Sequence, residues 1–325
     1  MLNRMSREAC PRVEDTAFAA SPLLASAVRE NVRIVGGRLL IPLLPRWPVL
    51  IRGLRTFGPV ISFCGNPWAL LGTAGRYPEV WSTPCGRKAR GGDLEFFFPP
   101  WSRAFATIEK ESGSWIYAAE FVDSLRNVLH KIHLTAESDW EAFRWWVEIN
   151  RAPSPVAETT PNIRVRSGVG VALASCEDEI LPVSETVFRA MLRQIVQEEF
   201  SVQVCLSNEG LAQRAEVSAK FLREKRDSLL LAAVNCGLQT RPGDLGEICF
   251  QRSRTSPGWA LKAYEPGGRL VFSVMAPADC CVQRAEEMLA ACCAKFAKGN
   301  PASRRRVLQA PFPGRHFGSK FLLEA

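Results

Sequence analysis

Residues 58–66 read GPVISFCGN, an apolar run that ends at a Gly-Asn turn. A short apolar run bounded by turn residues is typical of a buried strand. An amphipathic helical pattern, Trp47–Phe57, precedes this run, and the same order returns later in the chain. There a helical pattern over Glu185–Glu199 leads into the apolar run Val202–Leu206, and its turn residue Asn208 lies 142 positions after the turn asparagine of the first run. The two stretches predict two copies of one folding unit.

The repetition continues downstream in two predicted β-hairpins, 115–134 and 259–274, each of which begins with tryptophan. Their first residues lie 144 positions apart. A helical pattern follows each hairpin, and it opens at the capping box Ser138–Glu141 in the first copy and at Asp279 in the second. Strands joined by tight turns pair antiparallel. We therefore predict an α+β fold, a tandem duplication of a unit with an antiparallel β-sheet backed by helices.

Composition divides the chain into five predicted segments. A proline-rich stretch separates the two repeats, and residues 304–325 carry five basic residues against one acidic residue, within a net charge of +8. A basic tail of this kind is usually solvated. We do not expect nucleic acid to be a partner, and if it binds, it binds through this tail. The segments are an N-terminal extension (1–35), the first repeat (36–151), a linker (152–182), the second and more divergent repeat (183–298) and a basic C-terminal tail (299–325).

The overall composition is that of a folded globular protein. The chain has 325 residues, of which 47% are hydrophobic and 23% charged, and this excludes a disordered or fibrous chain. Its eleven cysteines include no Cys-x-x-Cys pair, so we expect buried thiols and no structural zinc. The longest apolar stretch, Leu39–Ile51, is interrupted by three prolines and an arginine. We expect no membrane span, no signal peptide and a reducing cytoplasm.

Three histidines limit the metal and acid-base chemistry that the chain can support. His130 and His133 are three positions apart, which would place both on one face of a helix. The apolar alternation around them predicts a strand instead, and on a strand they point to opposite faces. A joint metal site is therefore not expected. The sequence contains no nucleophile elbow, phosphate loop or dinucleotide fingerprint, and we assign no catalytic residue.

Aromatic residues gather between 96 and 105 and again between 140 and 146. The simplest interpretation is that these residues form hydrophobic core, and we expect Trp101 and Phe105 to be buried in the first repeat. The alternative is a wide apolar cleft for a flat ligand, with cations at its rim that meet carboxylates. The rim candidates are Arg76, Arg87, Lys88, Arg90 and Arg103.

Several motifs of the first repeat resemble the haemin-degrading and haem-trafficking family often called HemS-like. They are GPVISF at 58–63, Asn66, Gly75-Arg76-Tyr77, DLEFF at 93–97, and VLHKIHLT at 128–135. The resemblance covers about 55–150 well and 182–296 weakly. That family is a tandem duplication, which agrees with the repetition found from the residues.

The departures from the family pattern concern its histidines. The position five residues after the first turn asparagine holds Leu71, and the comparable position of the second repeat holds Ala215. The stretch 150–182, which corresponds to the family's iron-ligating helix, contains no histidine. Pro100 replaces the histidine that precedes the tryptophan of the first repeat, while Trp101 is kept.

The resemblance implies a cytoplasmic haem-binding protein for haem or iron utilisation, acting in haem trafficking or in oxidative haemin degradation. Haem is then the cofactor and partner, and the loss of the usual ligand puts enzymatic turnover in question. The second hypothesis is a haem-free scaffold or interaction protein that keeps the duplicated fold. The oligomeric state is left open. The candidate haem-binding residues are Arg76, Tyr77, Trp101, Arg103, His130 and His133, with His130 the first choice of iron ligand.

Overall fold

The computed structural model describes residues 33–35, 38–83, 86–111, 114–153, 179–225, 227–252, 259–276, 287, 291 and 292. Most of the predicted N-terminal extension and linker and all of the basic tail lie outside the described residues, as does His316. The chain forms two compact units. Unit 1 holds the described residues before 170 together with Ser207–Gln213 and Asn235–Gly237, and unit 2 holds the rest.

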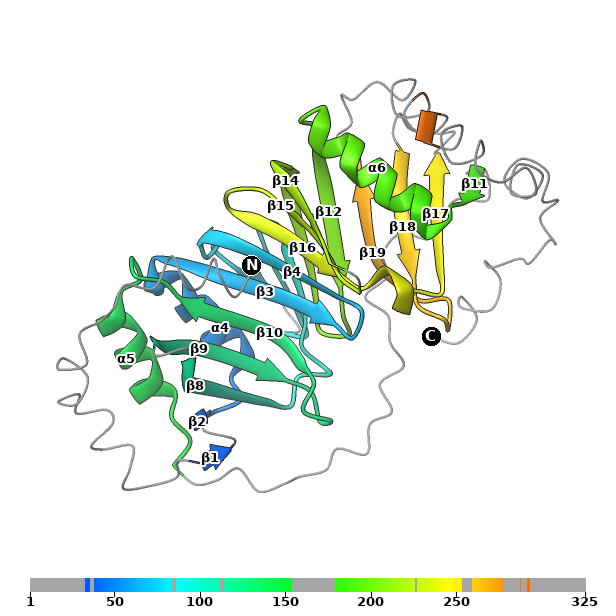
Figure 1. Cartoon of the computed structure of the whole chain (residues 1–325). Helices are drawn as coiled ribbons and strands as arrows, with labels where there is room; N and C mark the ends of the chain where they lie inside the picture. Colours follow the sequence, from blue (N-terminus) through cyan, green and yellow to red (C-terminus); the bar gives the residue numbers. More distant parts are fainter. Residues whose placement is uncertain are drawn as a thin grey trace. The chain divides into compact units, whose positions relative to one another are not determined.

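The main sheet of unit 1 is antiparallel throughout (Figure 1). The predicted apolar run and the predicted hairpin are both strands of this sheet. Its strands, in spatial order, are β1 (Arg33–Val35), β2 (Arg38–Leu43), β8 (Arg103–Glu111), β9 (Ser114–Val122), β10 (Val128–Leu134), β3 (Pro59–Asn66) and β4 (Ala69–Arg76).

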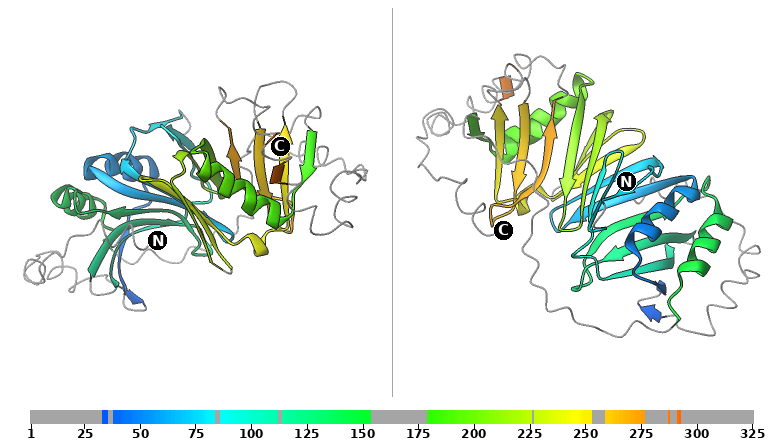
Figure 2. Two further views of the ribbon diagram at one scale, coloured as in Figure 1. Left: turned by 45° about the horizontal axis from the view of Figure 1, so that its top comes forward. Right: turned by 180° about the vertical axis from the view of Figure 1, so that it is seen from behind.

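Three helical segments cover one face of this sheet, which we call the helix face (Figure 2). They are α4 (Trp47–Gly53), the 3-10 turn η1 (Leu54–Phe57) and α5 (Trp140–Asn150). Helix α5 begins within the predicted capping box, but its cap is Asp139 and not Ser138, because the Asp139 side chain accepts a hydrogen bond from the Ala142 amide at 2.9 Å. Trp146 of α5 packs edge-to-face on Phe57, at 5.3 Å between ring centroids, and donates its indole N–H to the Leu50 carbonyl. Buried aromatic rings thus fix both helices to one another.

Two turn asparagines, Asn66 and Asn208, stabilise each other's hairpins inside unit 1. The Asn66 side-chain oxygen accepts from the Trp68 and Ala69 amides, and its nitrogen donates to the Ser207 carbonyl at 3.2 Å. Asn208 repeats the arrangement, because its oxygen accepts from two following amides and its nitrogen donates to the Gly65 carbonyl at 2.9 Å. The carbonyl to which each asparagine donates belongs to the residue directly before the other asparagine. The sequence repeat is therefore also a repeat of hydrogen bonds.

A smaller set of strands completes unit 1. The strands β5 (Trp81–Ser82), β6 (Lys88–Gly91) and β7 (Leu94–Phe97) form an antiparallel ribbon. Strand β7 also pairs with the start of β13 (Leu211–Ser218), with Leu211 opposite Phe96. This pairing brings Gly210 close to the aromatic residues around Trp101.

Unit 2 repeats the strand order of unit 1. The order β11-β17-β18-β19-β12-β13 corresponds to β2-β8-β9-β10-β3-β4, and helix α6 (Glu185–Gln197) occupies the chain position of α4. This agreement confirms the predicted duplication. The remaining elements of unit 2 are β11 (Glu179–Pro182), β12 (Ser201–Ser207), β14 (Phe221–Glu224), β15 (Leu229–Ala232), β16 (Cys236–Thr240), η2 (Pro242–Asp244), β17 (Glu247–Arg252), β18 (Trp259–Tyr264) and β19 (Leu270–Met275).

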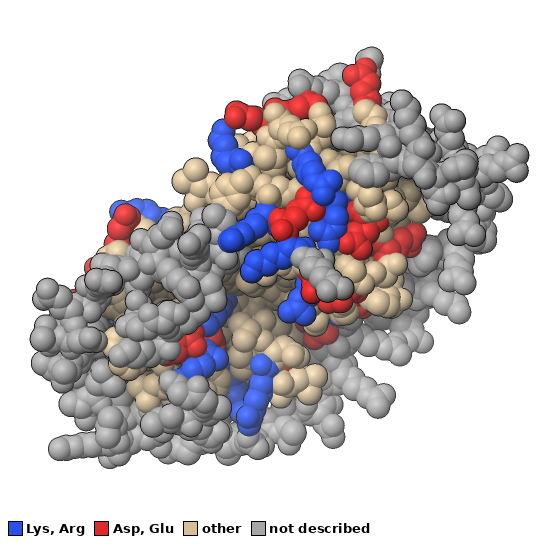
Figure 3. Space-filling model, viewed as in Figure 1, with Lys and Arg blue, Asp and Glu red and all other residues tan. Residues whose placement is uncertain are grey.

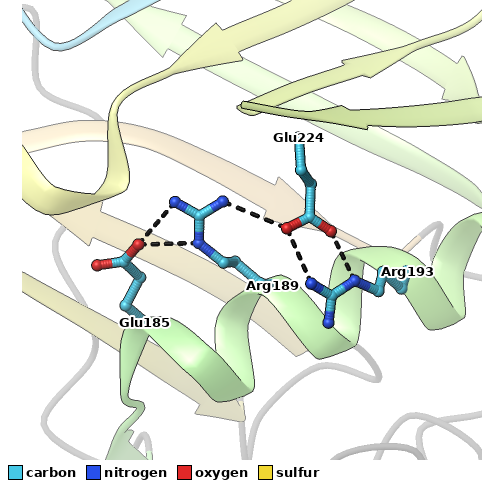
Figure 4. A network of polar contacts seen from close by, with 4 residues as sticks. All are labelled: Glu185, Arg189, Arg193 and Glu224. Atoms are coloured by element: carbon cyan, nitrogen blue, oxygen red, sulfur yellow. Dashed lines mark hydrogen bonds and ion pairs between the residues drawn. The ribbon is translucent and has the colours of Figure 1, made fainter. Parts of the chain in front are cut away.

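Ion pairs hold α6 against β14 in unit 2 (Figure 4). Arg193 binds both carboxylate oxygens of Glu224, at 2.6 and 2.8 Å, and Arg189 joins Glu224 to Glu185. Figure 3 shows basic and acidic side chains side by side over this part of unit 2. The arginine contacts are thus satisfied within the unit, which makes this charged surface a structural feature.

Candidate functional site

The two histidines of β10 lie on opposite faces of the unit 1 sheet, as the strand alternation predicts. His130 pairs with Phe121, and its ring contacts Phe121 on the helix face. His133 pairs with Ala118 on one side and Ile61 on the other, and its ring contacts Phe63 at 4.9 Å between centroids. We call the sheet face that carries His133 the far face. The two histidines therefore cannot share one metal ion.

His130 is fully buried, and both of its ring nitrogens have hydrogen-bond partners. Nδ1 lies 2.8 Å from the Phe63 carbonyl oxygen, and Nε2 lies 2.9 Å from the Tyr77 hydroxyl. Because a carbonyl only accepts, Nδ1 carries the proton and Nε2 accepts the Tyr77 O–H. Burial lowers the pKa of His130 to about 4 and raises the pKa of Tyr77 well above its usual value. The pair is neutral and its hydrogen bonds are complete.

Trp101 belongs to the same buried cluster. Its side chain is 5% exposed and donates its indole N–H to the Gly210 carbonyl at 3.0 Å. The rings of Phe96 and Phe121 lie 6.1 and 4.9 Å from it, centroid to centroid. The expectation that Trp101 is core is confirmed, whereas Phe105 is only partly buried and lies on the far face. Alternation explains the difference, because Phe105 pairs with Glu120, a far-face residue.

The two candidate arginines lie at strand ends. Arg76 is exposed at the end of β4, directly before Tyr77. Arg103 is partly exposed at the start of β8, and alternation along that strand puts it on the far face with Thr107 and Glu109. The structure thus brings Tyr77, Trp101 and His130 together in a buried cluster, and places Arg103 and His133 on one face of the sheet.

Four charged side chains on the far face form a ring of alternating sign. Arg38 contacts Glu109 at 2.8 Å and Glu120 at 2.5 Å, and Lys131 contacts the same two carboxylates at 3.2 and 2.9 Å. Glu120 is 4% exposed, and both cations contact its carboxylate. These residues were not among the predicted site residues. The signal was a single glutamate in the apolar strand SWIYAAEFV, because a buried carboxylate requires cationic partners.

His133 lies beside this ring of charges. Both of its ring nitrogens are buried, and neither has a hydrogen-bond partner among the residues that the structure describes. Burial, followed by the charges of Lys131 and Arg38, lowers the pKa of His133 to about 3. The ring is therefore neutral at physiological pH, with a lone pair that no described donor uses. The Thr107 hydroxyl on the same face is likewise buried without a partner in this part of the chain.

Two positions where the resemblance leads one to expect histidine are part of the core. Leu71 of β4 is fully buried, and Ala215 of β13 is 5% exposed. The described residues contain no group of three or more His, Cys, Asp and Glu side chains that could hold a metal ion. None of the helices that the structure describes is long and apolar enough to cross a membrane.

A known family model matches part of the first half of the chain. Residues 28–149 match the family model described as the haemin-degrading HemS.ChuX domain. No curated protein matches the sequence.

Solved structures share the fold over most of the chain at low sequence identity. Holo-PhuS, a haem-binding protein from Pseudomonas aeruginosa, matches with a TM-score of 0.64 and 16% identity over 77% of this chain and 86% of its own. ChuS, an Escherichia coli haem oxygenase, matches with a TM-score of 0.65 and 15% identity over 80% of this chain and 90% of its own. These likenesses confirm the duplicated α+β fold.

Proposed function

Because the chain is a HemS-like family member, we propose that it binds haem and serves haem or iron utilisation, either as a haem carrier or as an enzyme that degrades haemin. The observation that carries this proposal is the match of the family domain to residues 28–149, a range that includes all six candidate haem-binding residues. The fold shared with PhuS and ChuS supports it.

A haem site requires an apolar surface for the macrocycle, cations for the propionates and an axial ligand for the iron. Haem itself supplies an iron that binds dioxygen and accepts electrons. Within unit 1, the candidates for the cations are Arg76 and Arg103, and the candidates for the ligand are Tyr77, His130 and His133. Burial holds the pKa of His130 near 4 and that of His133 near 3, so both imidazoles are in the neutral form that binds metals. The nitrogens of His133, which have no hydrogen-bond partner among the described residues, support the fit of these residues to haem.

We also propose a cytoplasmic location. The cysteines at positions 64, 205, 236, 249 and 292 are buried, and none of these five forms a disulfide. Burial raises the pKa of Cys236 to about 11 and that of Cys249 to about 12, which keeps both thiols protonated and unreactive. Thiols in this state suit a reducing compartment.

A haem-free scaffold is the second candidate function. The observation that favours it is the burial of Leu71 and Ala215, since neither side chain has a lone pair to offer iron. A scaffold would keep the duplicated sheets and the paired asparagines and would bind no porphyrin specifically.

Titration of the full chain with haemin, followed by absorption, decides between these functions. We expect a sharp Soret band that saturates at one haem per chain. The control is Arg223→Ala, a change at an exposed residue of β14, and this variant should behave like the wild type. Broad absorbance that rises without saturation would support the scaffold. Adding a reductant and dioxygen to the loaded protein then separates the two haem functions, because only an enzyme bleaches the Soret band faster than free haemin does.

A further inference from the structure

The three candidate iron ligands differ in whether a lone pair is available. His130 uses Nε2 to accept the Tyr77 O–H and Nδ1 to donate to the Phe63 carbonyl. An iron bond at His130 would displace Tyr77 inside a fully buried cluster. Tyr77 is itself committed as the donor of that hydrogen bond. His133 alone among the three has ring nitrogens without a hydrogen-bond partner in the described part of the chain.

A buried nitrogen without a hydrogen-bond partner destabilises the folded state. Such groups are rare in native proteins, and one in a functional protein calls for a ligand or another explanation. His133 carries two of them on one ring. The residue as a whole is only partly buried, but both of its nitrogens are covered, so a bond to a ligand requires local movement of the side chains around the ring.

The surroundings of His133 suit an anionic, flat, metal-containing ligand. The Phe63 ring contacts the imidazole at 4.9 Å and fixes its plane by an edge contact. Arg38 and Lys131 lie on the same face, with 34% and 20% of their side chains exposed. Arg103 of β8 lies on the same face. Cationic side chains complement the two propionates of haem.

We propose that His133 is the axial ligand of the haem iron, bound on the far face of the unit 1 sheet beside Arg38 and Lys131. The proposal rests on the proposed haem-binding function. It moves the haem site away from the buried cluster of Tyr77, Trp101 and His130, which then serves as a structural core.

The test uses the full chain, ferric haemin and two variants of the ligand. His133→Ala leaves a cavity that free imidazole can enter, whereas His133→Phe fills the space with a ring that has no lone pair. We expect both variants to bind haem about tenfold more weakly or worse, with an altered Soret band. Addition of imidazole should restore the wild-type spectrum of His133→Ala and leave that of His133→Phe unchanged. A merely structural role for His133 would not produce this selective rescue.

The outcomes separate the inference from the function on which it rests. If the wild type binds one haem and both variants keep its spectrum and affinity, the ligand assignment is wrong and the haem function stands. If the wild type shows no saturable binding, both are wrong. Should either variant fail to fold, the variants His130→Phe and His316→Gln, each labelled with ¹⁵N only in histidine, give a second test. Pulsed EPR of the ferric haem complex should show coupling to a histidine nitrogen in both variants, and loss of that coupling in either one overturns the proposal.

Discussion

His130 and His133 are three residues apart on one strand, yet the two faces of the sheet treat them differently. On the helix face, His130 is enclosed by aromatic rings and both of its nitrogens are hydrogen-bonded. On the far face, His133 lies beside alternating charges and its nitrogens have no partner among the described residues. A buried imidazole thus stabilises a core when its hydrogen bonds are complete, whereas an imidazole whose nitrogens lack partners points to a ligand.

The largest loss of stability should follow a substitution in the core on the helix face. Trp101→Ala removes a buried aromatic ring and its hydrogen bond to the Gly210 carbonyl. We expect a loss of about 3–5 kcal/mol in the free energy of unfolding, measured by urea denaturation. A variant with unchanged stability would show that this cluster is not the core of unit 1.

Replacing His130 should lower the free energy of unfolding by somewhat less than replacing Trp101. His130→Phe keeps the ring and leaves the Tyr77 hydroxyl and the Phe63 carbonyl buried without a partner, for which we expect a loss of about 2–4 kcal/mol. Tyr77→Phe is the matched control, because it breaks only one of the two bonds and should cost about 1–2 kcal/mol. Equal stability of wild type and both variants, measured in parallel urea titrations, would contradict the hydrogen-bonded pair.

Stability should also depend on pH through the two buried histidines. The folded-state pKa of His130, about 4, lies below the ordinary value of 6.5, so the unfolded chain binds the proton first as the pH falls. The contribution of His130 to stability is therefore complete above pH 6.5 and is lost progressively between pH 6.5 and about 4. For His133 the window extends to about pH 3. Between pH 6.5 and 4, the free energy of unfolding of His130→Phe, measured by urea denaturation, should fall less than that of the wild type. An identical pH dependence of the two proteins would count against a neutral, buried His130.

The smallest effect on stability is expected at His133. His133→Phe replaces a ring whose nitrogens have no described partner with an apolar ring of similar shape, and such exchanges are close to neutral, within about 1 kcal/mol. The melting temperature without haem should match the wild type or exceed it. A large loss would mean that the nitrogens of His133 have partners in the folded chain.

The sequence alone predicts much of the fold but little of the site. Short apolar runs, turn asparagines and the cap at Asp139 have local signatures, so the repeat, the hairpins and helix α5 could be predicted. The alternation around His130 and His133 likewise predicted their opposite faces. Contacts between distant segments have no such signature. The bond from Tyr77 to His130 spans 53 positions, and the contact of Arg38 with Glu120 spans 82.

The same limit explains the assignment of His130 as first-choice ligand. Its motif resembles the family most closely, but a motif does not reveal which lone pairs a fold has already used. That assignment stays a prediction, and the bonded nitrogens of His130 are the physical reason why we propose His133 in its place. Phe105 was misplaced for a related reason, since an aromatic residue beside a buried Trp101 can still face the other side of a strand.

The NMR signals of the imidazole nitrogens decide most directly between the two histidines. The chain has only three histidines, so a ¹⁵N-histidine spectrum can be fully assigned with single variants. Before ligand is added, His130 should appear as the neutral tautomer protonated at Nδ1. On addition of gallium protoporphyrin, a diamagnetic analogue of ferric haem, one nitrogen of His133 should shift to a metal-bound position while the signals of His130 stay where they are. A metal-bound shift at His130 with His133 unchanged would contradict the account.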